Sequence, residues 1–315
     1  MIAGIVKDDG DEPLFHEGDK VAISERFPVG HYRVPHYIRG KSALVEEVIT
    51  PPAIDNEAEG FGRNVGLKRH YYRVSIPLTE LWPGYTGSPH DGLRIEVYEM
   101  AGKDLTMHPH DHTPIVATDE APGYYEIMET AVRELLVAKQ IISAGEIRRH
   151  LEVLDSRTPQ LGAKLVAKAW VDPDFKKRLL ADDRAACEEM GISFYENTEL
   201  TVLENTEKVH NLIVCTLCSC YPREVLGLPP DWYKLTPYRS RAVKEPRAVL
   251  AEFGTVIPDN VEIRVSDSTA MIRYLVLPRR PEGTDNMTEQ QLAELVTRDA
   301  MIGVVPVEFQ KGRVQ

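Results

Sequence analysis

Short apolar stretches alternate with polar turns over residues 1–105. The candidate strands are rich in Val, Ile and Tyr and are bounded by Gly, Pro and Asp; they are Lys20–Ser24, Ser42–Ile49, Tyr71–Ile76 and Leu93–Tyr98. Across residues 71–76 apolar and polar side chains alternate, as they do in a strand with one buried face. Several short strands within one such stretch predict a small β-barrel.

The pattern breaks between residues 102 and 122, where glycine, proline and histidine are frequent. His108, His110 and His112 lie in this stretch, and a histidine-rich tract can bind metal. We interpret it as a polar linker, because nothing in it implies a fixed coordination geometry. We therefore expect an N-terminal unit at residues 1–105, a linker at residues 106–122 and a second unit at residues 123–315.

Helical periodicity begins after the linker. Tyr124–Ile142 carries apolar residues at near-helical spacing, and a capping box at Ser143–Glu146 starts a second helix that runs to about residue 154. A third helix is expected to begin at the cap Asp172, which precedes a proline, and to end at Gly191. The second unit thus opens with helices.

From about residue 199 the pattern mixes strands with helices. The expected strands are Glu199–Leu203, Asn211–Val214, Val261–Val265 and Met271–Leu277, and a capping box at Thr288 begins a short helix through Leu295. The expected fold class is α+β: a small β-barrel, followed by helices and a layered α/β core.

Composition narrows the function classes. The chain has 315 residues, of which 43% are hydrophobic and 27% charged, and its net charge is −12. An acidic chain without a basic run is a poor match for nucleic acid or an anionic membrane. The first eleven residues contain no apolar signal core, and no apolar stretch approaches the roughly 20 residues of a membrane span. We expect a cytoplasmic protein.

Three of the four cysteines lie within six residues: Cys215, Cys218 and Cys220. Structural zinc and iron–sulfur sites usually need four ligands, and His210 precedes a strand that would carry it away. A thioredoxin-like redox motif or unconnected core thiols are further alternatives, and core packing is the interpretation for the isolated Cys187. Three sulfurs with the amide nitrogens of Ser219 and Cys220 could instead wrap one ion as a claw that leaves one position open. Such soft donors suit a trivalent transition ion.

The segment Val214–Pro222, followed by Val225–Pro230, resembles the α subunit of nitrile hydratases and equally the γ subunit of thiocyanate hydrolase. The resemblance covers about residues 124–304. It includes Gly162–Trp170, Asp231–Lys234, Tyr238–Arg247, Val249–Gly254, Glu262–Val265 and Thr297–Gly303. It implies a nitrile hydratase α-like fold for the second unit.

The N-terminal unit carries a second resemblance, to the C-terminal half of the nitrile hydratase β subunit, which is an SH3-like barrel. The matching segments are Phe15–Val21, Gly30–Lys41, Tyr72–Val74 and Glu80–Trp82. Nothing in this sequence resembles the helical N-terminal half of β. The resemblance therefore implies a β–α fusion that needs a separate helical subunit and works as a hetero-oligomer.

The resemblance also implies the chemistry of the claw. Thr216, where iron enzymes tend to have serine, favours non-corrin Co(III) over Fe(III). By the same resemblance Cys215 is the axial thiolate, Cys218 becomes a sulfinic acid and Cys220 a sulfenic acid. The amide nitrogens of Ser219 and Cys220 are ligands, and the sixth position holds water or substrate.

The implied reaction is hydration of a nitrile to an amide, with the metal as Lewis acid. Whether the attacking oxygen comes from water or from the sulfenate of Cys220 stays open. The site of about −2 charge needs cations, and the resemblance assigns Arg33 to hold the oxidised cysteines. Arg264 is interpreted first as an ion-pair or subunit-interface residue, and support of the claw from outside the ligand set is the sharper hypothesis for it.

Arg223 keeps a second substrate class open. Many nitrile hydratases have an aromatic residue three positions after the last claw cysteine, whereas an arginine there suits an anion such as thiocyanate. Arg223 could instead pair with the claw or with Glu224. An alternative of another class is a non-catalytic subunit that carries metal or assists assembly.

Overall fold

The computed structural model describes residues 13–23, 34–54, 68–98, 124–194, 198–217, 220–269 and 272–309. Several residues and segments singled out by the sequence lie outside these ranges. They include Arg33, Cys218, Ser219 and the predicted linker at residues 106–122 with its histidine-rich stretch.

The N-terminal unit is an antiparallel sheet. Its strands are β1 (Lys20–Ala22), β2 (Ser42–Ile54), β3 (Lys68–Pro77) and β4 (Gly92–Tyr98), paired in chain order. Alternate side chains are buried along much of β2, β3 and β4, which is the pattern of a strand with one face on a core. A short 3₁₀ helix, η1 (His36–Ile38), and the single turn α2 (Leu78–Leu81) complete the unit. The expected strands are confirmed, and closure into an SH3-like barrel stays a prediction.

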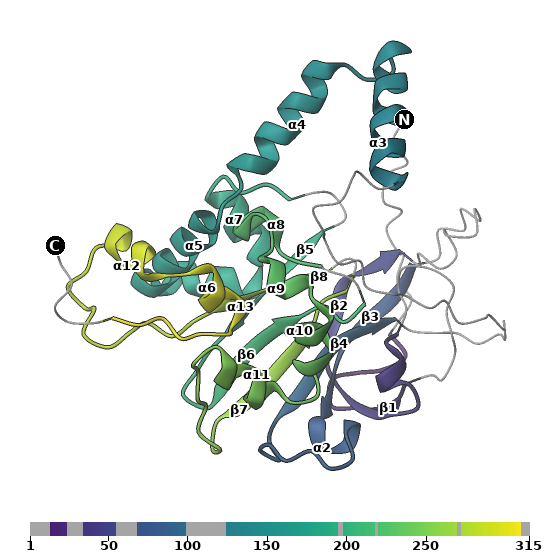
Figure 1. The fold of residues 1–315 in the computed structure, drawn as a ribbon. Helices are drawn as coiled ribbons and strands as arrows, with labels where there is room; N and C mark the ends of the chain where they lie inside the picture. Colours follow the sequence, from purple (N-terminus) through teal and green to yellow (C-terminus); the bar gives the residue numbers. More distant parts are fainter. Residues whose placement is uncertain are drawn as a thin grey trace.

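The two units share one sheet. Strand β4 pairs in parallel with β7 (Glu262–Asp267), which pairs in parallel with β6 (Val209–Val214), so the order is β1-β2-β3-β4-β7-β6 (Figure 1). Strands β5 (Glu199–Glu204) and β8 (Ile272–Leu277) form a second, two-stranded parallel sheet. The architecture is a mixed α/β fold in which both units contribute to one core.

Side chains tie the two units together at the β4 edge. Asp91 is fully buried, and its carboxylate accepts two bonds from Arg247, Nε at 2.8 Å and Nη2 at 2.9 Å. The same carboxylate accepts the backbone N–H of Ile263 at 2.9 Å. The Trp82 indole donates to the carbonyl of Val243 at 2.6 Å. The junction is therefore a packed and hydrogen-bonded interior rather than a loose contact between two domains.

Most helices of the second unit pack around the strands. They are α5 (Pro159–Val171), α6 (Pro173–Ala181), α7 (Asp183–Glu189), α8 (Arg223–Leu226), α9 (Asp231–Lys234), α10 (Thr236–Arg241), α11 (Pro246–Glu252), α12 (Glu289–Leu295) and α13 (Arg298–Ile302). The capping box at Thr288 is confirmed by reciprocal bonds with Gln291. No helix among the described residues has the length and apolar character needed to cross a membrane.

One predicted helix is wrong in extent. The segment from Asp172 to Gly191 forms two helices, because the Asp182 side chain accepts the N–H of Ala185 and starts α7 anew. The first helix ends at Ala181 because Asp182 leaves the helical conformation, and Asp172 caps its start as expected. The predicted Tyr124–Ile142 helix is also shorter, since α3 ends at Ala138.

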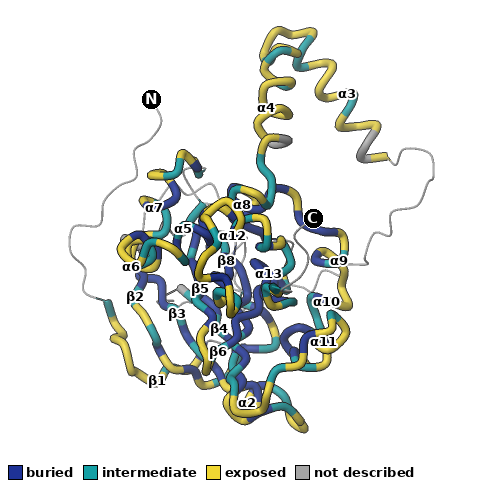
Figure 2. Tube along the Cα trace, turned by 90° about the vertical axis from the view of Figure 1, so that its left-hand side faces the viewer, coloured by how far each residue is buried: buried dark blue, intermediate teal, exposed yellow. Residues whose placement is uncertain are grey.

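Helices α3 (Tyr124–Ala138) and α4 (Ala144–Ser156) form an arm that projects from the body (Figures 1 and 2). Their apolar side chains are exposed: Tyr124, Ile127, Met128, Val132, Leu135 and Leu151 are among the exposed large hydrophobic residues. An amphipathic helix gains most of its stability from packing its apolar face. The arm therefore presents a hydrophobic surface that the described part of the chain leaves uncovered.

Candidate metal centre

The cysteine-rich segment begins where strand β6 ends. Val214, the last residue of β6, is paired with Asp267, the last residue of β7. Ligand sites in parallel sheets commonly lie at the carboxyl ends of the strands. The segment leaves the sheet at this edge and reaches the first turn of α8 at Arg223.

Two of the predicted ligands are described, and both are buried. Cys215 is 0% exposed and Cys220 is 9% exposed. Within the described part of the chain no group of three His, Cys, Asp or Glu side chains converges as a metal site. The third thiol, Cys218, and the amide of Ser219 lie outside that part. The structure therefore places the two ends of the predicted claw and leaves its middle a prediction.

Arg239 holds the first turn of the claw. From α10 its Nε donates to the carbonyl of Cys215 at 2.9 Å, and its Nη2 donates to the carbonyl of Thr216 at 2.8 Å. A guanidinium thus lies beside a site that is expected to be negatively charged. Arg264, the sharper sequence-based hypothesis for such support, instead pairs with Glu262 on its own strand, in line with its first interpretation as an ion-pair residue.

The Asp267 carboxylate, at the end of β7, holds the same turn through Thr216. Its Oδ1 accepts the backbone N–H of Thr216 at 2.8 Å, and its Oδ2 accepts the Thr216 hydroxyl at 2.5 Å. The Tyr37 hydroxyl donates to Oδ2 at 2.7 Å. Burial raises the pKa of Asp267 to about 6, and the bonds from Thr216 and Tyr37 oppose that rise. Three donors on one buried carboxylate fix the residue that follows Cys215.

Tyr233 holds the other end. Its hydroxyl donates to the carbonyl of Cys220 at 2.9 Å, and its ring packs edge-on against Tyr221 with centroids 5.1 Å apart. Burial raises the pKa of Tyr233 well above its ordinary value, with smaller contributions from Tyr238 and the Cys215 thiol. The phenol therefore stays protonated and remains a donor. The backbone on both sides of the claw is held by side chains.

Arg223 is exposed at the start of α8. Among the described residues its side chain forms no hydrogen bond or ion pair, and the neighbouring Glu224 instead faces Arg157 at 3.8 Å. The interpretation in which Arg223 pairs with Glu224 is therefore wrong. Its pairing with the claw stays a prediction, because Cys218 and Ser219 lie outside the described residues.

His210 and Cys187, the other two residues considered as ligands or thiols in the sequence analysis, are buried in the core. His210 is buried, and its Nε2 lies 2.7 Å from the carbonyl of Gly303. Gly303 has φ +92°, and a Cβ there would meet the Asn211 carbonyl oxygen at 2.0 Å, so only glycine fits. Cys187 is buried in α7, and burial raises the pKa of its thiol to about 12. His210 is therefore bonded in the interior rather than placed as a metal ligand, and Cys187 is a core side chain.

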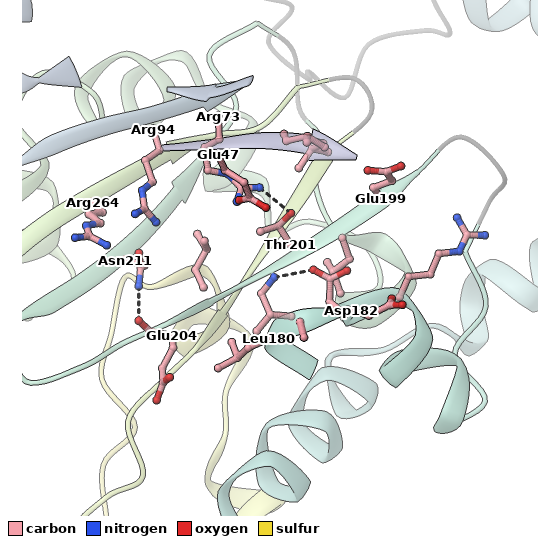
Figure 3. A pocket seen from close by; sticks show the side chains of 18 residues that line it. Glu47, Arg73, Arg94, Leu180, Asp182, Glu199, Thr201, Glu204, Asn211 and Arg264 are labelled. Carbon is pink, nitrogen blue, oxygen red and sulfur yellow. Dashed lines mark hydrogen bonds and ion pairs between the residues drawn. The ribbon is translucent and has the colours of Figure 1, made fainter. Parts of the chain in front are cut away.

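A charged cavity of about 600 Å³ lies between the two sheets (Figure 3). Arg73, Arg94 and Arg264 line one side, while Asp182 and other acidic residues line the opposite side. Arg73 pairs with Glu47 and Glu96, and Arg94 pairs with Glu46. No described residue of the cysteine segment lines this cavity, so it is separate from the candidate metal centre.

Two family models match the chain in consecutive segments. Residues 6–100 match the model "Nitrile hydratase beta subunit, C-terminal", and residues 123–305 match the model "Nitrile hydratase, alpha chain". The second match spans more than half of the chain. The chain belongs to the nitrile hydratase α-chain family. The order of the two matches is that of a β–α fusion.

Relatives support both parts of the fusion. The α subunit of the low-molecular weight cobalt-containing nitrile hydratase of Rhodococcus rhodochrous is 58% identical over 175 residues, which cover 55% of this chain and 84% of that protein. The nitrile hydratase β subunit of Pseudomonas putida is 34% identical over 100 residues, 30% of this chain and 43% of that protein. The chain thus spans less than half of the β subunit.

Solved structures give the same assignment. A recombinant thiocyanate hydrolase with partially modified cobalt centres matches with a TM-score of 0.57 and 44% identity, over 60% of this chain and 92% of that one. An Fe-type nitrile hydratase from Comamonas testosteroni Ni1, a double mutant, matches with a TM-score of 0.55 and 42% identity, over 60% of this chain and 97% of that one. About 60% of the chain thus shares its fold with a cobalt-containing thiocyanate hydrolase and an Fe-type nitrile hydratase.

The sequence alone missed the residues that hold the claw. Tyr37, Tyr233 and Arg239 all lie in segments that carry the family resemblance, but their spacing gives no hint of contact. Asp267 had a usable signal, because a carboxylate at the carboxyl end of an apolar strand lies where ligand sites form.

Proposed function

We propose that this chain is the metal-bearing, fused subunit of an enzyme that hydrates a C≡N bond and converts a nitrile to an amide. The observation that carries the proposal is the buried pair Cys215 and Cys220, held by Arg239, Asp267 (through Thr216) and Tyr233 at the carboxyl edge of the sheet. Tight fixing of a segment on both sides of a ligand set is what a preorganised metal site requires. A carrier subunit that only transports metal would need a site that also releases it.

The donor set fits non-corrin Co(III), and the names of relatives add to that support. Thiolates from Cys215, Cys218 and Cys220 with amide nitrogens of Ser219 and Cys220 would hold the ion. The described surroundings fit a soft ion, because the nearby Asp267 carboxylate is occupied by Thr216 and Tyr37. Three relatives are named cobalt-containing nitrile hydratase α subunits. We further propose that Cys218 becomes a sulfinic and Cys220 a sulfenic acid.

Bound cobalt would supply Lewis-acid polarisation of the substrate nitrogen. The chain's own groups supply position and charge. Arg239 fixes the carbonyls of Cys215 and Thr216 by hydrogen bonds, and Tyr233 does the same for the carbonyl of Cys220. Burial of the thiols removes competing water. Arg33, in the SH3-like unit, would donate to the oxygens on the cysteines.

We also propose a hetero-oligomer in a cytoplasmic setting, with a helical chain equivalent to the N-terminal half of the β subunit as the partner. The N-terminal unit matches only the C-terminal model of that subunit. The arm α3–α4 exposes apolar side chains, including Ile127 at 58% and Leu135 at 53%. A helical partner would cover this surface with an apolar face of its own.

Charging the arm is expected to abolish assembly without unfolding the chain. The double substitution Ile127→Glu and Leu135→Glu places two charges where the partner would pack. Burying these charges without partners should abolish binding of the helical partner. Co-purification with the partner and sedimentation measure the loss. Val256→Glu is the matched control, because Val256 is 83% exposed away from the arm. Co-purification equal to wild type would refute the arm as the docking surface, and self-association of the isolated chain through it would identify a second copy instead.

Thiocyanate hydrolysis is the second candidate, and exposed Arg223 favours it. Replacing Arg223 by tryptophan restores the aromatic residue expected at this position and removes a cation that attracts anions. If thiocyanate is a substrate, Arg223→Trp should lower kcat/KM for thiocyanate at least about tenfold, with a weaker effect at high salt. If a nitrile is the substrate, the same change should leave or raise kcat/KM for an aromatic nitrile. Turnover of neither compound by the cobalt-loaded complex would leave the carrier role.

A further inference from the structure

Tyr37 connects the N-terminal unit to the claw of the same chain. It lies in η1, and its hydroxyl donates at 2.7 Å to a carboxylate 230 residues later, that of Asp267. Asp267 is fully buried and holds both the backbone N–H and the hydroxyl of Thr216. Thr216 directly follows Cys215. The Asp267 carboxylate and Thr216 therefore link the N-terminal unit to Cys215, the first ligand of the predicted claw.

The Tyr37 ring is held by Trp82, a residue of the N-terminal unit that is itself anchored to the second unit. It stacks on Trp82 with ring centroids 5.4 Å apart and planes 26° apart. Trp82 donates to the carbonyl of Val243 at 2.6 Å, and the Lys244 ammonium lies 5.2 Å from its ring centroid. A hydroxyl on a fixed ring loses little entropy when it bonds to Asp267. The fixed Tyr37 ring is therefore suited to holding the Asp267 carboxylate in position.

Three donors share the Asp267 carboxylate, and two of them come from the same residue, Thr216. The Tyr37 hydroxyl is the donor that comes from the other unit, and it bonds to Oδ2, the oxygen that also accepts the Thr216 hydroxyl. Without it the carboxylate would have a buried oxygen with one fewer donor and more freedom to rotate. The turn that starts at Cys215 would then lose part of its support.

We propose that Tyr37 is a positioning residue that fixes the claw of its own chain, so that the fused N-terminal unit acts in cis rather than on a second copy. The proposal rests on the proposed function in that it takes Cys215 and Cys220 as metal ligands. It goes further by naming the group through which the N-terminal unit reaches the claw and by assigning that contact to one polypeptide.

The first test compares two tyrosine-to-phenylalanine variants in the cobalt-loaded complex. Tyr37→Phe removes one hydroxyl and should lower kcat about tenfold with a smaller change in KM, and it should shift the thiolate-to-cobalt absorption band. Tyr85→Phe is the matched control: its hydroxyl donates to Asp91 at 2.6 Å, in the junction and away from the claw. That variant should leave the band unchanged. An unaltered band and kcat in Tyr37→Phe would overturn the proposal, whereas wild-type protein without cobalt would overturn the proposed function instead.

The second test asks whether the contact is made in cis. Tyr37→Phe and Cys220→Ala chains, with different tags, are co-produced, and the mixed assembly is purified through both tags. If the contact is in cis, every chain carries one defect, and activity and the absorption band should not exceed the sum of the two separate variants. If a second copy supplied Tyr37, the mixed assembly would contain intact sites, and recovery of activity and of the band would contradict the proposal.

Discussion

Replacing Cys220 by alanine is expected to abolish turnover and cobalt retention while the chain stays folded. Cys220 is 9% exposed and its carbonyl is held by Tyr233, so the substitution removes a sulfur from a fixed site. Loss of a thiolate and of its oxidised form leaves an incomplete set of soft donors. Activity should fall by at least about a thousandfold, which corresponds to about 4 kcal/mol of transition-state stabilisation. Cobalt content and nitrile turnover are measured on the purified complex.

Cys187→Ala is the control for this prediction. Cys187 is a buried thiol in α7, where burial raises its pKa to about 12, and it lies outside the claw segment. The variant should lose some stability through the small cavity it creates and keep its cobalt and activity. Equal loss of cobalt in both variants, or full cobalt and activity in Cys220→Ala, would contradict the assignment of the claw.

Replacing Asp91 by alanine is expected to destabilise the whole chain by about 3–5 kcal/mol, the typical cost of breaking a buried ion pair. The Arg247 guanidinium is 18% exposed and would keep its bonds to carbonyls, among them those of Ile257 and Val261, both at 2.8 Å, and a 3.8 Å contact with the exposed Asp259. The backbone N–H of Ile263 would also lose its acceptor. Because Asp91 and Arg247 belong to different units, denaturant unfolding of the wild-type protein should show one transition, and the variant should shift it to lower denaturant.

Glu252→Ala is the matched control for the ion pair. Glu252 also pairs with an arginine, Arg241, but both side chains are exposed, so solvent screens the pair and its loss should change little. Two separate transitions in the wild-type protein would show that the units fold independently. An unfolding midpoint for Asp91→Ala equal to that of wild type would refute the stabilising role of the junction.

The sequence predicted those strands and helix starts whose signals lie in neighbouring residues. The strands of the N-terminal unit and the capping boxes at Ser143 and Thr288 are present, since both depend on neighbouring residues. The helix after Asp172 was drawn too long, because the second cap at Asp182 was hidden inside an apolar pattern that continues across it. The short helices α8–α11 carry no periodicity long enough to detect.

In the candidate site, the predicted ligands are close together in the sequence, whereas the residues that hold them are distant. Three cysteines in six residues are a local pattern, so the ligands could be named from the sequence. The groups that hold them could not: Tyr37 meets Asp267 across 230 residues, and Arg239 reaches back across 24 residues to the Cys215 carbonyl. Such contacts depend on which strands pair, and the parallel pairing of β4 with β7 joins two units that the sequence presented as separate.

The central claim is that the cysteine segment is an oxidised cobalt claw. The most direct measurement is cobalt content together with the mass of the peptide that contains Cys215, Cys218 and Cys220, on the chain produced with cobalt and its helical partner. The account predicts about one cobalt per chain and a gain of about 48 Da on that peptide, the mass of three oxygens from one sulfinic and one sulfenic acid. Zinc in place of cobalt, with three unmodified thiols, would contradict it.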